Sequence, residues 1–256
     1  MKNLPSGWPP IPLSTTGVPT TPVPLVLAFH GFSGTSAEME DWFGLSAMAD
    51  EAGFIVVYPQ GIGDPPQWDL PGSSDTTFVD ALLTAASVQL CIDPLRVFAT
   101  GWSIGGGMTN VVACRLADRI AAVAPVDGLY GPAWGDPCTP SRPVPVIAFH
   151  GQADNFVPYA GGQAMDQPVI GVEEWAAAWA ERDRCSSGPV QQASIGDVEP
   201  LFWVGCAAPV ELYRITHGGH TWPGQGEDGA FGHVTKDISA NDLMWDFFVA
   251  NPLPAA

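Results

Sequence analysis

The chain has 256 residues, of which 46% are hydrophobic, so it can build one sizeable core and is short for two domains. Its 27 acidic and 9 basic side chains give a formal net charge of -18. Negative charge of this size repels phosphate backbones and anionic lipid surfaces, which argues against nucleic-acid and membrane partners. Neutral substrates suit it better than strongly anionic ones, and protein partners leave no signal in the sequence.

The first 24 residues are rich in Pro and Thr and show no periodicity. We expect residues 1–24 to form an extended arm, followed by a single domain over residues 25–256. Pro5, Pro9 and Pro10 exclude an apolar signal core here, and no uninterrupted apolar stretch reaches the roughly 18 residues of a membrane span. The low lysine content, 26 prolines and 10 tryptophans favour a secreted enzyme whose signal peptide is not present in this sequence.

The chain carries five cysteines, an odd number, so at least one thiol is free unless two chains are cross-linked. Cys185 and Cys206 flank a Gly/Ser-rich excursion, whereas Cys114 and Cys138 flank a strand and a Pro-rich loop. Both spacings suit the disulfides of a secreted protein. Buried thiols in a reduced, cytosolic protein are the alternative, and the residues themselves leave it open.

Segments of two kinds alternate along the rest of the chain. Short apolar runs of strand length, each bounded by Gly, Pro or Asp, lie at Leu25–Phe29, Phe54–Tyr58, Val97–Thr100, Ala121–Val126, Val146–Phe149 and Val210–Ile215. Apolar residues at helical spacing follow these runs, in patterns that contain Met39, Phe78, Met108, Trp175 and Leu243. The alternation predicts the α/β class, with a mostly parallel central sheet and helices on both of its faces.

The sharpest motif is GWSIG at residues 101–105, directly after an apolar run and directly before a helical pattern. A nucleophilic serine on a tight strand-to-helix turn needs small neighbours, because the helix must approach the strand closely. A glycine-rich packing turn or a phosphate-binding loop would be the alternative, but the P-loop lysine and the dinucleotide G-x-G-x-x-G pattern are missing. The motif therefore predicts Ser103 as the nucleophile and the backbone amide of Ile104 as an oxyanion donor.

A serine nucleophile needs a histidine base, and the base needs an orienting acid that comes between the two in chain order. His220 follows the last predicted strand and is favoured over His217; a metal site built on these two histidines lacks further ligands. Asp154 follows the strand that ends near residue 150 and is favoured as the acid. Asp127 also follows a strand and is the alternative.

The loop HGFSG at residues 30–34 follows the first core strand. In hydrolases with a serine elbow, the loop at this place supplies the second oxyanion amide, which we assign to the backbone of Phe32. His30 precedes the nucleophile and would break the expected order, so we expect it to form hydrogen bonds within the loop. Trp68, Trp102 and Trp222 are candidate substrate-binding walls, with core packing as the alternative for each.

Six segments of the chain together resemble one known family: LVLAFHGFSG, GFIVVYPQG, RVFATGWSIGGGM, APVDG, PVPVIAFHGQADNFVPY and HGGHTWPG. They are similar to the polyhydroxybutyrate depolymerase and feruloyl esterase family of carbohydrate esterases, over about Leu25 to Phe248. The resemblance implies an α/β-hydrolase fold, no cofactor and export from the cell. It also implies Ser103, Asp154 and His220 as the catalytic residues, because the acid lies in H-G-x-x-D-x-x-V-P-Y and the base in G-H-T-W-P-G.

The resemblance further implies disulfides, because family members commonly join cysteines placed like Cys114/Cys138 and Cys185/Cys206. That pairing would leave Cys91 as the single free thiol.

The chain departs from the family pattern at two places. Residues 1–24 lack the antiparallel hairpin that usually opens the fold. Ser74 precedes Asp75 where the family usually has two adjacent acidic residues, which changes a loop contact near the site without touching the catalytic residues.

The sequence thus predicts a serine carboxylic-ester hydrolase that works through an acyl-enzyme, with His220 accepting the proton of Ser103. A feruloyl-esterase-like enzyme on plant cell-wall esters is the leading interpretation. Poly(3-hydroxybutyrate) depolymerase and acetylxylan esterase are the alternatives within the enzyme class. A non-catalytic carbohydrate-binding relative is the alternative from another class, and mere binding does not call for a complete set of catalytic residues.

Overall fold

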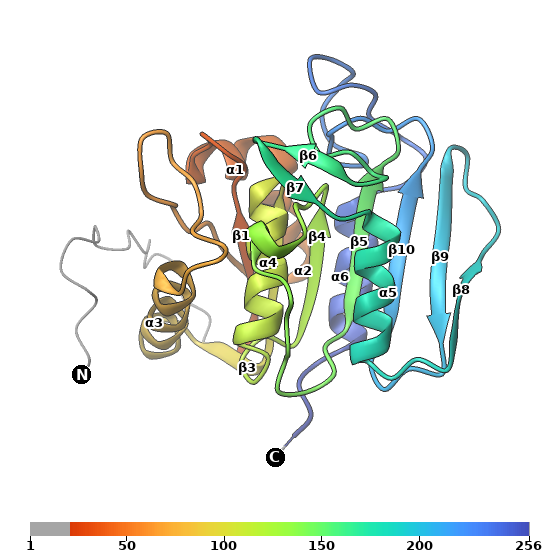
Figure 1. The fold of residues 1–256 in the computed structure, drawn as a ribbon. Helices are drawn as coiled ribbons and strands as arrows, with labels where there is room; N and C mark the ends of the chain where they lie inside the picture. Colours follow the sequence, from red (N-terminus) through yellow and green to blue (C-terminus); the bar gives the residue numbers. More distant parts are fainter. Residues whose placement is uncertain (1–20, 256) are drawn as a thin grey trace.

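The computed structural model describes residues 21–255, which form a central sheet with helices on both faces (Figure 1). In chain order the sheet strands are β1 (Val23–Phe29), β2 (Ile55–Val57), β3 (Ile92–Trp102), β4 (Ala122–Val126), β5 (Val146–Gly151), β8 (Ser187–Gln191), β9 (Val198–Val204) and β10 (Val210–Ile215). Their spatial order is β2-β1-β3-β4-β5-β10-β9-β8. A separate hairpin consists of β6 (Gly162–Ala164) and β7 (Gln167–Val169).

The sheet is mostly parallel, as predicted. Strands β2, β1, β3, β4, β5 and β10 run parallel to one another, and β9 and β8 are antiparallel additions at one edge. All six predicted apolar runs fall on the parallel strands. Parallel strands present their carboxyl ends at one edge of a sheet, so the loops that follow β3, β4, β5 and β10 meet there.

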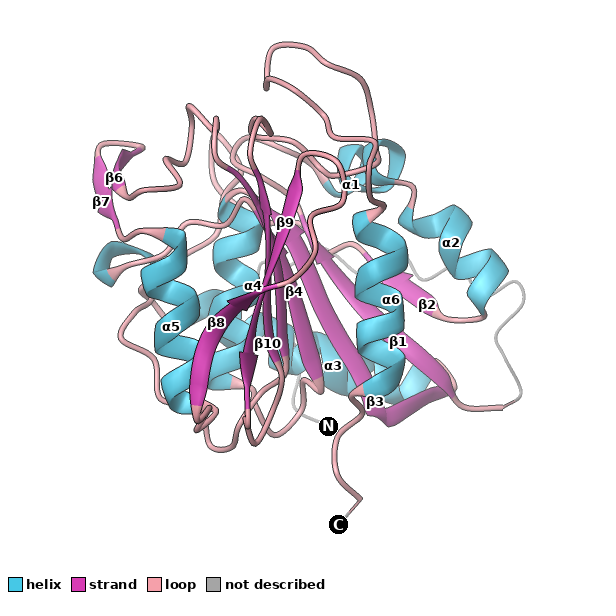
Figure 2. Ribbon diagram, turned by 90° about the vertical axis from the view of Figure 1, so that its right-hand side faces the viewer, coloured by secondary structure: helices cyan, strands magenta, loops and turns pink. Residues whose placement is uncertain are grey.

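The helices are α1 (Ser36–Phe43), α2 (Leu45–Ala52), α3 (Ser74–Gln89), α4 (Ile104–Arg115), α5 (Val172–Arg182) and α6 (Ala240–Ala250). Helices α3, α4 and α5 cover one face of the sheet, and α1, α2 and α6 cover the other (Figure 2). Each face has its own buried core. Successive residues of β1 alternate between the two cores, because neighbouring side chains of a strand point to opposite faces.

The first helical pattern of the sequence forms two helices instead of one. Gly44 sits between α1 and α2 with φ at +67°, a left-handed conformation that ends α1. A capping box begins α1, because the Thr35 side chain accepts from the Glu38 N–H and the Glu38 side chain accepts from the Thr35 N–H. Ser239 caps the start of α6, because its hydroxyl accepts from the Asp242 N–H at 3.2 Å.

Two features of the edges were not predicted. Strand β8 is exposed along its whole length and the β6–β7 hairpin has only three residues on each side, so neither has the apolar alternation that marks a half-buried strand. Most of the arm predicted over residues 1–24 lies outside the described residues, and β1 begins at Val23. In the described sheet, β2 forms the edge beyond β1.

Ser74 and Asp75, where the chain departs from the family pattern, form a loop contact at the start of α3. The Asp69 N–H donates to the buried Asp75 carboxyl at 2.6 Å, and the Ser74 hydroxyl donates to the Asp69 carboxylate at 2.8 Å. These bonds hold the loop before α3 in place.

Disulfides join Cys114 to Cys138 and Cys185 to Cys206, and Cys91 is the free cysteine, which confirms the pairing that the family resemblance implied. The first bond links α4 to the loop after Trp134, and the second links the end of α5 to the loop between β9 and β10. Among residues 21–255 no helix is both long and apolar enough to cross a membrane.

Thiol titration of the denatured, unreduced protein should find one reactive thiol, and reduction should raise the number to five. Replacing Cys185 and Cys206 together by alanine should lower the free energy of unfolding by about 2–4 kcal/mol, because the bond restricts the unfolded chain. Urea unfolding of the variant measures this loss. Three or more thiols before reduction would contradict the pairing.

Candidate active site

Ser103 stands on the sharp turn between β3 and α4. Its φ of +61° and ψ of -124° lie outside the regions that L-residues ordinarily adopt, so the surrounding structure must hold this conformation. The Ser103 N–H donates to the Val126 carbonyl oxygen of β4 at 3.0 Å, which fixes the turn to the neighbouring strand. The turn lifts the serine to the carboxyl-end edge of the sheet.

The glycines of the motif are required because α4 lies against the sheet with no room for a side chain. A Cβ on Gly105 would lie 2.1 Å from the Phe29 carbonyl oxygen, and a Cβ on Gly101 would lie 2.4 Å from the Gly105 carbonyl oxygen. Neither contact can be relieved without moving backbone.

His220 and Asp154 are paired at the same edge. Asp154 follows β5 and His220 follows β10, and both side chains are buried. The Asp154 Oδ2 lies 2.7 Å from His220 Nδ1, and its Oδ1 accepts the N–H groups of Phe156 and Val157 at 2.8 Å each. A carboxylate is an acceptor, so Nδ1 carries the proton of the neutral imidazole and Nε2 is its basic nitrogen. His217, the alternative base, is exposed.

Asp127, the alternative acid, lies further from the imidazole. Its Oδ2 is 3.9 Å from His220 Nδ1, while its Oδ1 accepts the Gly151 N–H at 3.0 Å. Complete burial, followed by the negative charge of Asp154, raises the pKa of Asp127 well above its usual range. Burial also acts to raise the pKa of Asp154, but hydrogen bonding to His220 and the nearby histidines outweigh it and hold that pKa below the usual value. The negative charge therefore resides on Asp154.

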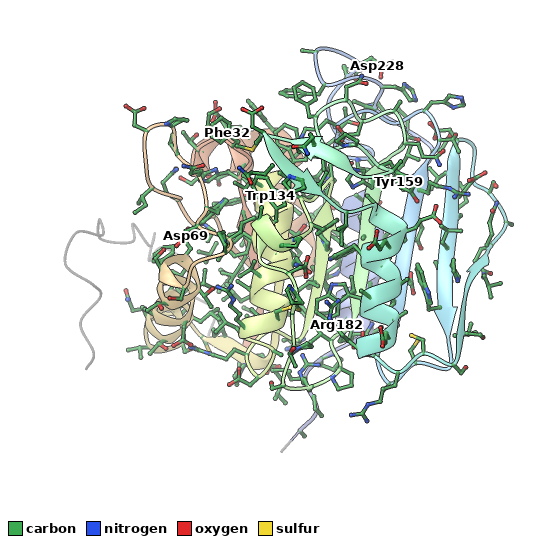
Figure 3. The ribbon with its side chains drawn as sticks, viewed as in Figure 1. Phe32, Asp69, Trp134, Tyr159, Arg182 and Asp228 are labelled. Carbon is green, nitrogen blue, oxygen red and sulfur yellow. A yellow bond between two sulfur atoms is a disulfide. The ribbon has the colours of Figure 1, made fainter. Side chains whose placement is uncertain are left out.

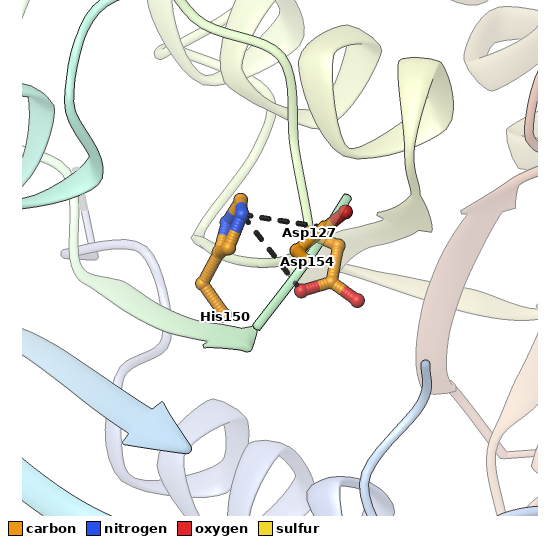
Figure 4. Close-up of side chains that lie close together, drawn as sticks. All are labelled: Asp127, His150 and Asp154. Atoms are coloured by element: carbon orange, nitrogen blue, oxygen red, sulfur yellow. Dashed lines mark ion pairs between the residues drawn. The ribbon is translucent and has the colours of Figure 1, made fainter. Parts of the chain in front are cut away.

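His150 completes a buried cluster with Asp127 and Asp154 (Figure 4). Its Nε2 lies 2.9 Å from the Val157 carbonyl oxygen, 3.5 Å from Asp154 Oδ2 and 4.0 Å from Asp127 Oδ1. Burial lowers the pKa of His150 to about 4, so the ring is neutral at neutral pH and Nε2–H donates to the carbonyl. Two of the possible ligand atoms of the cluster are thus already engaged, His150 Nε2 by Val157 and Asp154 Oδ2 by His220. The cluster supports the paired acid and base.

The oxyanion loop after β1 has two of its amides engaged. The Ser33 N–H donates to the Pro66 carbonyl oxygen and the Gly34 N–H donates to the Gly31 carbonyl oxygen. Within residues 21–255, the N–H groups of Phe32 and Ile104 have no hydrogen-bond acceptor. These are the two amides that the sequence assigns to the oxyanion hole.

His30 forms hydrogen bonds within this loop, as expected. Its Nδ1 lies 2.7 Å from the Gly31 carbonyl oxygen and its Nε2 accepts the Gly61 N–H at 2.9 Å, which fixes the Nδ1–H tautomer. Burial lowers the pKa of His30, so the ring stays neutral. His30 ties the oxyanion loop to the segment after β2.

Ser103 and His220 line one cavity of about 570 Å³. Large apolar side chains that are only partly buried surround it: Phe32, Trp42, Phe156, Met165 and Phe231. Figure 3 shows Phe32 at the carboxyl-end edge of the sheet, beside α1. Among the described residues that line the cavity, Glu38 and Asp166 are the only acidic ones, and none is Lys or Arg.

The three predicted tryptophan walls have different places. Trp102 lines the cavity, and its ring centroid lies 4.8 Å from that of His220. Trp68 lines a neighbouring cavity. Trp222 is core: its ring stacks on Phe43, and its Nε1–H donates to the Asn241 side chain at 2.8 Å.

Four walls were missed by the sequence analysis: Trp42, Phe156, Met165 and Phe231. Three of them lie in loops or turns, where an apolar residue has no periodic partner to signal its direction. One clue was available in the sequence: Phe156 comes two residues after Asp154, in the same loop.

Solved structures share this fold. An acetyl xylan esterase from Aspergillus awamori is similar with a TM-score of 0.68 at 17% identity, over 91% of each chain. The esterase PE8 is similar with a TM-score of 0.58 at 18% identity, over 89% of this chain and 94% of that one. This likeness shows the α/β-hydrolase fold, and the serine turn and the buried acid–histidine pair lie at the edge of the sheet where this fold places its active site.

Curated relatives narrow the class to a family, although no family model matches the chain. Probable feruloyl esterase C of Aspergillus terreus is 30% identical over 234 residues, 88% of this chain and 77% of that protein. Feruloyl esterase B of Piromyces equi is 31% identical over 219 residues, 80% of this chain but only 41% of that protein. The chain belongs to the feruloyl esterase family.

The Gly105→Ala variant should unfold at markedly lower denaturant concentration than the wild type. A Cβ at 2.1 Å from a backbone oxygen exceeds ordinary overpacking, so the free energy of unfolding should fall by at least about 3 kcal/mol. Gly229→Ala is the matched control, because a Cβ there meets only the Glu227 carbonyl oxygen at 3.9 Å. Equal stability of the two variants would show that α4 can move away from β1.

Proposed function

We propose that this protein is a secreted feruloyl-type esterase that releases an aromatic acid from plant cell-wall esters, with Ser103, Asp154 and His220 as its catalytic residues. The observation that carries the proposal is the buried Asp154–His220 pair, whose histidine lines an aromatic-walled cavity together with a serine on a strained strand-to-helix turn. Names of relatives support the substrate class, since several are feruloyl esterases.

The proposed reaction is acyl transfer through Ser103. His220 Nε2 takes the hydroxyl proton as the oxygen attacks the ester carbonyl, and Asp154 stabilises the imidazolium that forms. The free amides of Phe32 and Ile104 hold the developing oxyanion. His220 then protonates the leaving alcohol. Water hydrolyses the acyl-enzyme by the same two steps, with water as the nucleophile and the Ser103 oxygen as the leaving group.

The cavity supports an aromatic acyl group over an acetyl group. Five aromatic rings of the lining offer faces and edges to a planar substrate: Phe32, Trp42, Trp102, Phe156 and Phe231. The cavity volume of about 570 Å³ is within the range for small-molecule ligands. An acetyl group would leave most of this apolar surface in contact with water. The acidic lining disfavours substrates that carry a carboxylate.

Export is supported by the two disulfides, since such bonds form and persist in oxidising compartments. The net charge of -18 supports neutral ester substrates over anionic polymers or lipid surfaces.

Ser103→Ala should remove the activity without removing the fold. Hydrolysis of methyl ferulate should fall by at least about a thousandfold, because the catalytic residues act as a unit, while the melting temperature stays near that of the wild type. Methyl ferulate, a hydroxybutyrate trimer and acetylated xylan should be compared side by side with the wild type. Turnover by the variant close to the wild-type rate would sink the mechanism, and preference for acetylated xylan would sink the aromatic assignment.

Asp154→Asn and Asp127→Asn should separate the two carboxyl groups. Asparagine at 154 removes the charge that fixes the His220 tautomer, so kcat/KM should fall by about 100-fold to 10,000-fold. Asparagine at 127 resembles the protonated acid that burial favours there, so kcat/KM should stay within about threefold of wild type. An inactive Asp127→Asn beside an active Asp154→Asn would transfer the orienting role to Asp127.

A further inference from the structure

A second cavity of about 440 Å³ lies beside the catalytic one. Its apolar walls include Ile62, Trp68, Ile104 and Trp134. Met165 lines both cavities and is the one lining residue that they share among the described residues. The Met165 side chain is therefore a partition between the two spaces.

Met165 occupies the tip of the β6–β7 hairpin, which lies across the end of α4 that carries Ser103 (Figure 1). Both residues of its two-residue turn have positive φ, Met165 at +50° and Asp166 at +59°. Turns of this type usually take Asn, Asp or Gly at these positions, so the chain accepts a conformational cost at Met165 to present methionine here. The Met165 side chain is 42% exposed and unbranched, so it can change rotamer easily.

Two walls of the second cavity are fixed by hydrogen bonds. The Trp134 Nε1–H donates to the Pro168 carbonyl oxygen of β7 at 3.1 Å, and the Trp68 Nε1–H donates to the His30 carbonyl oxygen at 2.9 Å. Both tryptophans are buried, and Figure 3 shows Trp134 beneath the hairpin, against α4. Met165 is thus an adaptable wall next to the two fixed tryptophans.

The second cavity lies on the acyl side of the scissile bond. This step rests on the proposed function: His220 must reach the oxygen of the leaving alcohol, so the alcohol lies toward His220 and the acyl group away from it. The second cavity is lined by Ile104, the residue next to Ser103, and His220 is not among its lining residues. A chain that extends from the acyl carbon therefore meets Met165 and then this cavity.

We propose that the second cavity is a distal acyl subsite and that Met165 controls entry to it. Its ligands are the far ends of neutral, apolar acyl chains that are too long for the catalytic cavity. Tryptophan, isoleucine and proline side chains supply the apolar contact, and the acidic groups of Asp69 and Asp75 on its border disfavour chains that end in a carboxylate.

Met165→Ala should move the acyl-length preference toward longer chains. We would measure kcat/KM for p-nitrophenyl esters from acetate to decanoate and compare the decanoate-to-acetate ratio between proteins. Each methylene that newly enters an apolar site contributes about fourfold, from about 0.8 kcal/mol per buried CH₂, so the ratio should rise at least about tenfold above wild type.

Two control variants sharpen the test. Met165→Leu keeps a large side chain at the partition and should keep the wild-type ratio. Val190→Ala truncates a similarly exposed apolar residue on the edge strand β8 and should change neither rate. Thermal melts of all variants check that the hairpin change leaves the fold intact.

Each remaining outcome has a definite meaning. An unchanged ratio in Met165→Ala, with acetate still hydrolysed, would overturn the subsite. An equal rise on acetate and decanoate would also overturn it, since Met165 would then only obstruct the catalytic cavity. A wild type that hydrolyses none of the esters would overturn the proposed function itself, and the subsite with it.

Discussion

The close approach of α4 to the sheet is the constraint on which the site depends. The helix begins at Ile104 so near to β1 that only hydrogen fits as the side chain of Gly105. This contact holds the sharp bend at Ser103, and the first amide of α4, as at any helix N-terminus, has no intrahelical partner. The packing contact therefore keeps the proposed nucleophile and the proposed oxyanion donor together at one edge of the sheet.

The proposed base, His220, depends on an electrostatic difference between two buried carboxyl groups. Two negative charges this close together and this deeply buried would be strongly unfavourable, so one group must hold a proton. Asp154 receives two backbone N–H groups and the imidazole, whereas Asp127 receives the Gly151 N–H and has an oxygen without a partner. The hydrogen bonds assign the charge to Asp154. His150 stays neutral and fills the remaining space without adding a competing charge.

Much of this arrangement could be predicted from the chain, because the relevant signals are local. The apolar runs mark the parallel strands, and strand order along the chain brings Ser103, Asp154 and His220 to one edge of the sheet. The break at Gly44 was missed because the apolar face continues across it. The walls Phe156 and Phe231 were missed because their directions depend on loop conformations that no periodic pattern records. Tryptophan is a residue type that often contacts substrates, but the Trp222 Nε1–H donates to the Asn241 side chain within the core.

The proposed catalytic residues and the walls of the cavity therefore lie on parts of the fold that differ in rigidity. Ser103 is fixed by α4 and β4, and the proposed acid and base are held by buried hydrogen bonds, so the proposed reacting groups lie on the rigid part of the fold. The walls come from α1, from the loops around Phe156 and Phe231, and from the tip of the β6–β7 hairpin. The side chains there are partly exposed, so a substitution removes few buried contacts. Changes at these walls can alter the acyl group that is accepted while leaving the reacting atoms in place. In this protein, the proposed substrate choice therefore depends on loops and turns, and the proposed chemistry on the ends of the sheet strands.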